Sequence, residues 1–249
     1  MSPAKLSPVL LFVLVVSTVL FLAPLAHPSN GPTPFPSEAD KWPGRGVIRV
    51  FDWMSARREQ FWRERERQQR SVVFAGDSLT ENWRTLAQDF PGMRLANRGI
   101  GGDVSRGLLF RFEEDVLALH PRAIVVLIGI NDLTAHQPAA DTLHNVAAML
   151  DLRDALSAGT PVILCSVPPS AHPKAPVDER QRRALNDGLR SLAERRDVVL
   201  FVDLFAALAR EDGSPEPRFF KADLLHLSQA GQARWKQVLM PALREAGVL

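Results

Sequence analysis

The chain has 249 residues, of which 46% are hydrophobic and 23% charged, a composition typical of globular proteins and not of disordered or fibrous ones. Its 30 Lys and Arg against 28 Asp and Glu leave a net charge of +2, too small an excess to indicate a nucleic-acid-binding protein. The single cysteine, Cys165, excludes an internal disulfide and any metal site with several cysteine ligands.

The first 26 residues predict a membrane-associated segment. Residues 6–26 carry no charge, and about 20 apolar residues suffice to span a bilayer. A signal peptide has a shorter apolar region and a small-x-small cleavage site, which Pro24 and Phe21 disfavour here. We expect a single N-terminal helix that anchors the protein in the membrane, or a secreted protein if the segment is cleaved. Positive charge precedes the segment and none follows it until Lys41, which favours an extracytoplasmic location.

Residues 27–46 contain five prolines and three glycines, which predicts a semi-extended tether and not packed structure. The folded domain is therefore expected at residues 47–249, a length sufficient for a substantial hydrophobic core.

Within this domain, short apolar runs alternate with helical patterns. The first helix is expected at residues 51–70, which are crowded with Arg and Glu and predict a solvated charged face. Continuous apolar runs at residues 123–128 and 162–167 are typical of parallel strands covered on both faces. Shorter strands are expected at 72–75, 95–97 and 198–202, and further helices at 79–89, 104–119, 139–158, 178–196 and 228–246. This alternation predicts a three-layer α/β/α sandwich with a five-stranded parallel sheet.

Ligands bind such sheets at the carboxyl ends of the strands. Candidate functional residues follow three strands and recur near the C-terminus, as Gly76-Asp77-Ser78, Asn97-Arg98-Gly99-Ile100-Gly101-Gly102-Asp103, Gly129-Ile130-Asn131-Asp132 and Asp223-Leu224-Leu225-His226. Each is weak alone: a serine at a strand–helix junction is usually a helix N-cap, and the glycines lack the spacing of a dinucleotide loop. Together they supply a nucleophile, a base, a carboxylate and oxyanion donors, the parts of a serine hydrolase.

These four blocks, in this order, resemble the SGNH (GDSL-type) hydrolase family over residues 72–231. The stretch 97–132 looks most like the branch of platelet-activating-factor acetylhydrolases and lysophospholipases. The resemblance implies a flavodoxin-like sandwich and the following roles: Ser78 as nucleophile; Asp223 and His226 as the pair that activates it; and Ser78, Gly102 and Asn131 as donors of the oxyanion hole.

The chemistry suits these residue types. An imidazole titrates near neutral pH and can take the serine proton, and an aspartate three residues earlier can orient the ring. The serine then forms an acyl-enzyme, which water hydrolyses. The resemblance implies no metal or other cofactor.

Some residues have competing interpretations. Asp141 and His144 form a second Asp-x-x-His, but within an expected helix and without the Leu-Ser-x-x-Gly that follows His226. Arg98 and Arg106 could meet an anionic head group or form surface pairs. Gln232 stands where the family usually has an aromatic residue.

The sequence predicts a serine esterase acting on a small ester or lipid substrate, either lysophospholipase-like or specific for short acyl chains. The alternatives are an O-acetyl esterase or acyltransferase acting on cell-surface carbohydrate, and, more remotely, a non-catalytic binding module. Substrate cannot be chosen on fold alone.

Overall fold

The computed structural model describes residues 30–249, and the expected membrane segment lies outside them. In this described part, no helix is both long enough and apolar enough to cross a membrane. Residues Gly31–Leu249 form one compact unit.

Five parallel strands form the central sheet in the order β2-β1-β3-β4-β5. They are β1 (Val72–Gly76), β2 (Leu95–Gly99), β3 (Ala123–Leu127), β4 (Val162–Cys165) and β5 (Val199–Val202). Every residue of β1, β3 and β4 is buried, as expected for strands covered on both faces. The predicted three-layer α/β fold with its five-stranded parallel sheet is confirmed.

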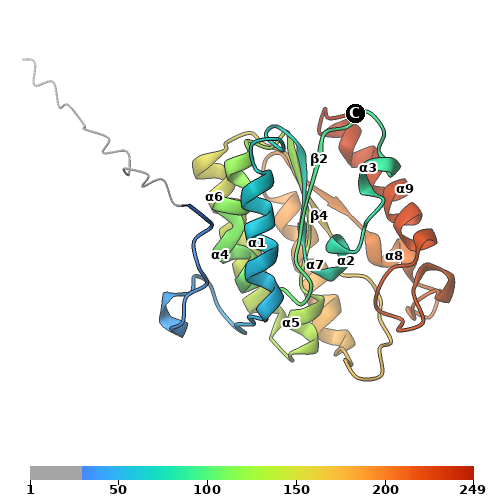
Figure 1. Ribbon diagram of the computed structural model, residues 1–249. Helices are drawn as coiled ribbons and strands as arrows, with labels where there is room; N and C mark the ends of the chain where they lie inside the picture. The colour runs from blue at the N-terminus through green and yellow to red at the C-terminus, as the bar shows by residue number, and fades with distance from the viewer. Residues whose placement is uncertain (1–29) are drawn as a thin grey trace, which may run out of the picture. The chain divides into compact units, whose positions relative to one another are not determined.

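Helices cover both faces of this sheet (Figure 1). On one face lie α1 (Asp52–Glu64), α4 (Ser105–Asp115) and α6 (Ala139–Leu156), and α7 (Glu179–Glu194) packs beside α6. The other face carries α2 (Ser78–Glu81), α3 (Leu86–Asp89), α8 (Leu204–Leu208) and α9 (Gln229–Glu245). The short helix α5 (Ile130–Thr134) follows β3. Helices α5 and α8 were not expected, since five residues are too few to show a helical period.

Strand register brings the candidate site together. Gly76, the last residue of β1, pairs with Gly99 of β2 and with Leu127 of β3. The three strands therefore end level, and the loops that follow them start from one edge of the sheet. Ser78, Gly102 and Asn131 all lie in or just after these loops.

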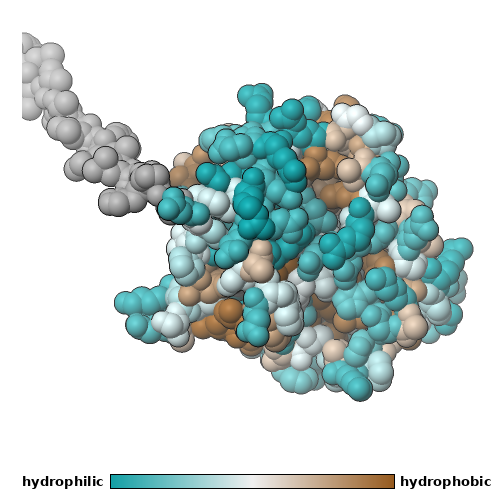
Figure 2. All heavy atoms as spheres, viewed as in Figure 1, coloured by the Kyte–Doolittle hydropathy of each residue, from teal (hydrophilic) through white to brown (hydrophobic). Residues whose placement is uncertain are grey.

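Helix α1 is shorter than expected and only partly solvated. It ends at Glu64, and its inner face buries Met54, Arg58 and Phe61. Its outer surface is mostly hydrophilic, as Figure 2 shows, in agreement with the predicted charged face. Arg58 on the inner face is thus a structural residue, whereas the charged residues of the outer face are solvated. The density of Arg and Glu in the sequence does not distinguish these two faces.

The described part of the expected tether, residues 31–46, packs on the domain. Trp42 is 5% exposed and stacks on Phe35 with ring centroids 5.6 Å apart, and both rings contact Phe110 of α4. The backbone N–H of Arg45 donates to Asn145 Oδ1 of α6 at 2.8 Å. The aromatic residues of this segment bury apolar area and so hold it on the helices.

Candidate active site

Ser78 lies where β1 gives way to α2. The side chain of Asp77 caps this helix, because its Oδ1 accepts the N–H of Leu79 at 2.9 Å. Ser78 is the first helical residue, so its own N–H lies outside the helical hydrogen-bond ladder. The turn needs Gly76, since a Cβ there would lie 2.1 Å from the carbonyl oxygen of Leu127.

His226 and Asp223 form a hydrogen-bonded chain with Ser78. His226 Nε2 lies 3.0 Å from Ser78 Oγ, and His226 Nδ1 lies 2.6 Å from Asp223 Oδ2. These distances are those of a nucleophile, base and orienting carboxylate. The structure therefore brings together the three residues that the sequence predicts as a catalytic triad, across 148 positions of sequence.

A tight turn fixes the His226 and Asp223 side chains. Asp223 Oδ1 accepts the N–H groups of Leu225 and His226, each at 3.0 Å. Leu224 has a φ of +50°, a left-handed conformation that is strained for a leucine. Its carbonyl oxygen accepts the N–H of Ala171 at 2.9 Å, so the loop after β4 holds the turn.

These contacts determine the ionisation of Asp223. Partial burial alone would raise its pKa, but the hydrogen bonds from His226 and from the N–H of Leu225 outweigh burial and lower the pKa to about 2. Asp223 is therefore an anion throughout the neutral range and can stabilise a charged imidazole beside it.

The predicted oxyanion donors Gly102 and Asn131 lie in the loop after β2 and in α5. Gly102 has a φ of +83°, and a Cβ there would lie 2.7 Å from the ring of Phe51, so only glycine fits. Within residues 30–249, its N–H donates to no protein acceptor. Asn131 Nδ2 donates one hydrogen to the carbonyl oxygen of Asp103 at 2.9 Å, which leaves its second hydrogen for a ligand.

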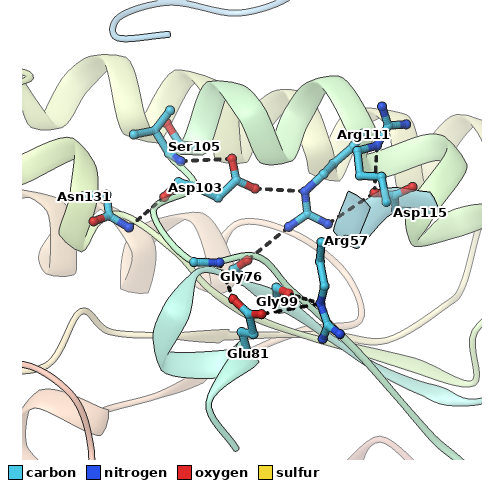
Figure 3. Close-up of polar contacts among 12 residues, drawn as sticks. Arg57, Gly76, Glu81, Gly99, Asp103, Ser105, Arg111, Asp115 and Asn131 are labelled. Carbon is cyan, nitrogen blue, oxygen red and sulfur yellow. Dashed lines mark hydrogen bonds and ion pairs between the residues drawn. The ribbon is translucent and has the colours of Figure 1, made fainter. Parts of the chain in front are cut away.

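Buried charges support this side of the site (Figure 3). Asp103 accepts from Arg111 Nε at 2.8 Å, and Arg111 also donates to the carbonyl oxygen of Gly76 at 3.0 Å and pairs with Asp115 at 3.5 Å. Next to Asn131, the carboxylate of Asp132 accepts the N–H of Ser105 at 3.0 Å. The first turn of α4 is thereby tied to α5.

Burial dominates the ionisation of these carboxyl groups. It raises the pKa of Asp103 to about 6 although Arg111 pulls in the opposite direction, and it raises the pKa of Asp132. Burial also raises the pKa of Asp77 to about 8, because the hydrogen bond from Leu79 compensates only in part. Sequence reasoning missed Arg111, because its position in α4 gives no sign of its contact with Gly76 at the end of β1.

The residues with competing interpretations in the sequence lie outside this site. Asp141 and His144 are in α6, and His144 is exposed. Arg98 is 1% exposed and stacks over Phe61, while Arg106 donates to the carbonyl oxygens of Pro43 and Gly46, so neither is free to meet a head group. In the described part of the chain, no three His, Cys, Asp or Glu side chains converge as metal ligands do.

Gln232 occupies the position that departs from the family pattern. It is 9% exposed, and its Nε2 donates to the carbonyl oxygen of Asn82 at 3.1 Å. Asn82 ends α2, the helix that begins with Ser78. The glutamine therefore links α9 to the nucleophile helix by a hydrogen bond.

Residues 74–234 match the GDSL-like Lipase/Acylhydrolase family. The chain is 30% identical to platelet-activating factor acetylhydrolase IB subunit alpha1 from Bos taurus over 188 residues, which are 72% of this chain and 77% of the relative. A GDSL-like lipase from Bacteroides thetaiotaomicron is similar in structure, with a TM-score of 0.66, 26% identity and coverage of 75% of this chain and 98% of that one. An acetylxylan esterase from Geobacillus stearothermophilus, at 24% identity, TM-score 0.56 and coverage of 71% and 93%, shares the fold.

Proposed function

This chain belongs to the GDSL-like lipase/acylhydrolase family, and we propose that it is a serine esterase that hydrolyses short-chain acyl esters through a Ser78 acyl-enzyme. The observation that carries the proposal is the continuous hydrogen-bonded chain from Ser78 Oγ through the His226 ring to Asp223.

In the proposed reaction, His226 Nε2 takes the Ser78 proton as Oγ attacks the ester carbonyl carbon. Asp223 holds the proton on His226 Nδ1 and stabilises the imidazolium. The negative charge on the carbonyl oxygen is met by the N–H groups of Ser78 and Gly102 and by the side-chain amide of Asn131. His226 then returns the proton to the leaving alcohol, and it activates the water that releases the acid.

The short acyl chain is supported by the curated relatives. These relatives are platelet-activating factor acetylhydrolase subunits, and they match across 72% of this chain. The glycine loop borders the nucleophile, since a Cβ on Gly101 would lie 3.8 Å from Ser78 Cβ.

Hydrolysis of p-nitrophenyl esters from acetyl to long acyl by the full chain tests this proposal. We expect the highest kcat/KM for acetyl or another short chain, and a loss of about 10⁶-fold in kcat in Ser78→Ala and in His226→Ala. His144→Ala is the matched control, since this exposed histidine belongs to the other Asp-x-x-His, and it should retain wild-type activity.

A profile that rises with chain length would favour the lysophospholipase-like alternative. Product analysis with sugar acceptors identifies an acyltransferase, and release of acetate from O-acetylated polysaccharide identifies a carbohydrate esterase. Wild-type rates equal to those of Ser78→Ala on every ester would contradict the proposal and favour a binding module.

We also propose that the enzyme works outside the cytoplasm, attached to the membrane by its N-terminal segment. The support is the uncharged run at residues 6–26 and the position of Lys5 before it. Membrane fractionation of the full chain, with N-terminal sequencing, tests this: a membrane-bound protein that begins at Met1 is expected, and a cleaved, soluble product would show secretion instead.

A further inference from the structure

The peptide that joins Gly101 to Gly102 has little conformational preference of its own. Neither residue has a Cβ, and Gly102 already lies at a φ of +83°, so rotation of this peptide plane meets few steric barriers. The same peptide carries the N–H of Gly102, which the proposed function uses as an oxyanion donor. The turn that contains this peptide is closed by the N–H of Asp103 and the carbonyl oxygen of Ile100 at 3.1 Å, a contact that both orientations of the central peptide allow, so groups outside the loop select between them.

Trp53 in the first turn of α1 contacts this peptide directly. Its indole Nε1–H donates to the carbonyl oxygen of Gly101 at 2.9 Å. In a trans peptide the C=O and the N–H point in opposite directions. Holding the Gly101 oxygen toward the indole consequently holds the Gly102 N–H away from it.

Phe51 and Glu81 also support the Gly101–Gly102 peptide. Phe51 stacks on Trp53 with ring centroids 4.5 Å apart and planes inclined by 13°, and it covers the Cα of Gly102. On the other side, the N–H of Gly101 donates to Glu81 Oε2 at 2.6 Å, and Glu81 belongs to the helix that begins with Ser78. Figure 3 shows Glu81 and Arg57 beside the end of β2 at Gly99.

We propose that Trp53 is a positioning residue that holds the Gly101–Gly102 peptide in the orientation needed to stabilise the oxyanion. Its hydrogen bond also polarises the peptide, which strengthens the N–H of Gly102 as a donor. The inference rests on the proposed serine esterase mechanism. Trp53 lies outside residues 74–234, the part of the chain that matches the family, so the helix before β1 completes a site whose other parts belong to the matched region.

Trp53→Phe in the full chain tests the inference because it keeps an aromatic ring against Phe51 and removes the indole donor. We expect kcat for p-nitrophenyl acetate to fall about tenfold with KM unchanged, less than the 10²–10³-fold loss of a whole oxyanion donor. Trp53 is 53% exposed, so the thermal unfolding midpoint should stay within about 2 °C.

Trp62→Phe is the matched control. Trp62 lies on the same helix and stacks with Arg65 at 3.9 Å, so its substitution makes the same chemical change away from the glycine loop. Its kcat and KM should equal those of the wild type.

Labelling by a fluorophosphonate separates this inference from the choice of ester. Ser78 Oγ attacks phosphorus, fluoride leaves, His226 takes the serine proton, and the phosphoryl oxygen occupies the oxyanion hole. We expect Trp53→Phe to slow labelling about tenfold as well. A wild type that is labelled but hydrolyses no p-nitrophenyl ester would contradict the proposed function, while the ratio of labelling rates would still test Trp53.

Two results would overturn the inference. The first is a Trp53→Phe variant within twofold of the wild type in both assays. The second is a raised KM at unchanged kcat, which would make Trp53 a wall that contacts substrate and not a support for the oxyanion donor.

Discussion

The candidate site has an acid–base side, with Asp223 and His226, and an oxyanion side, with Gly102 and Asn131. The two sides are built in different ways. The acid–base side comes from one four-residue turn, in which Asp223 orients His226 and is bound by backbone N–H groups of the same turn. The oxyanion side is assembled from α1, the β2–α4 loop, α4 and α5 around buried charges. Function on the first side depends on local geometry, whereas function on the second depends on packing among distant segments.

The carboxyl groups of the two sides titrate in opposite directions. Hydrogen bonds lower the pKa of the partly exposed Asp223 to about 2, while burial raises the pKa of Asp103 to about 6 and that of Asp77 to about 8. Burial accounts for the raised pKa values because the interior destabilises the charged form, whereas at the more accessible Asp223 the hydrogen bonds from His226 and Leu225 outweigh this effect.

Asp223→Asn should break the acid–base side alone. The amide can still accept the backbone N–H groups through its oxygen, but it presents an NH₂ to His226 Nδ1 and imposes the wrong tautomer. We expect kcat for p-nitrophenyl acetate to fall about 10⁴-fold at an unchanged unfolding midpoint. Asp141→Asn, the same change in the other Asp-x-x-His, is the control and should be fully active; equal activity of the two variants would contradict the assignment of the triad.

Arg111→Met should destabilise the oxyanion side. It leaves the buried carboxyl groups of Asp103 and Asp115 without one of their cations, and breaking a buried pair lowers the free energy of unfolding by about 3–5 kcal/mol. Urea denaturation measures this loss. Arg190→Met is the control, because its ion pair with Asp203 is exposed and should contribute at most about 1 kcal/mol; similar losses in both variants would show that the buried network has no special role.

Asn131→Ala should remove one oxyanion donor and leave the triad intact. We expect kcat to fall about 10²–10³-fold, equivalent to roughly 2.7–4 kcal/mol, with KM little changed. Steady-state kinetics on p-nitrophenyl acetate measures the loss. Asn131→Asp should be at least as damaging, since it replaces the donor with a negative charge; an active Asp variant would place the oxyanion elsewhere.

Asp77→Asn should change how stability depends on pH. An aspartate in the unfolded chain ionises near 3.8, but Asp77 in the native protein keeps its proton up to pH about 8. Between these values the native state binds more protons than the unfolded state, so the free energy of unfolding falls as pH rises, by at most about 1.4 kcal/mol per pH unit. The Asn variant lacks this decline, and urea denaturation from pH 5 to 8.5 should therefore show a flatter dependence than in the wild type.

The matched control is Asp178→Asn. Asp178 also caps a helix, α7, but it is at the surface, where the hydrogen bond from the N–H of Arg180 lowers its pKa. Asp178 is therefore ionised above pH 5 in both the native and the unfolded protein. Its substitution should leave the pH dependence of the free energy of unfolding unchanged. A wild-type slope equal to that of Asp77→Asn would show that Asp77 is ionised in the native protein.

The sequence by itself determined the layers, and its motifs predicted Ser78, Asp223 and His226 as a catalytic triad. Apolar runs such as residues 123–128 become buried strands because a strand covered on both faces excludes polar side chains. The Asp223–His226 pair could also be predicted from the sequence, since both partners lie within four residues. Its assignment to Ser78 came from the family resemblance, and the structure places His226 Nε2 3.0 Å from Ser78 Oγ.

Only the tertiary structure decided what surrounds the oxyanion loop. The density of Arg and Glu at residues 51–70 predicted a helix with a solvated charged face, but it did not predict that Arg58 is buried or that Trp53 donates a hydrogen bond to Gly101. The proline-rich segment before it predicted a semi-extended tether, yet residues 31–46 pack on Phe110 of α4 through Phe35 and Trp42. These contacts join residues about 50 to 100 positions apart, and composition and periodicity carry no information on which distant partner a side chain meets. That partner is chosen by the packing of α1 and α4 on the completed sheet.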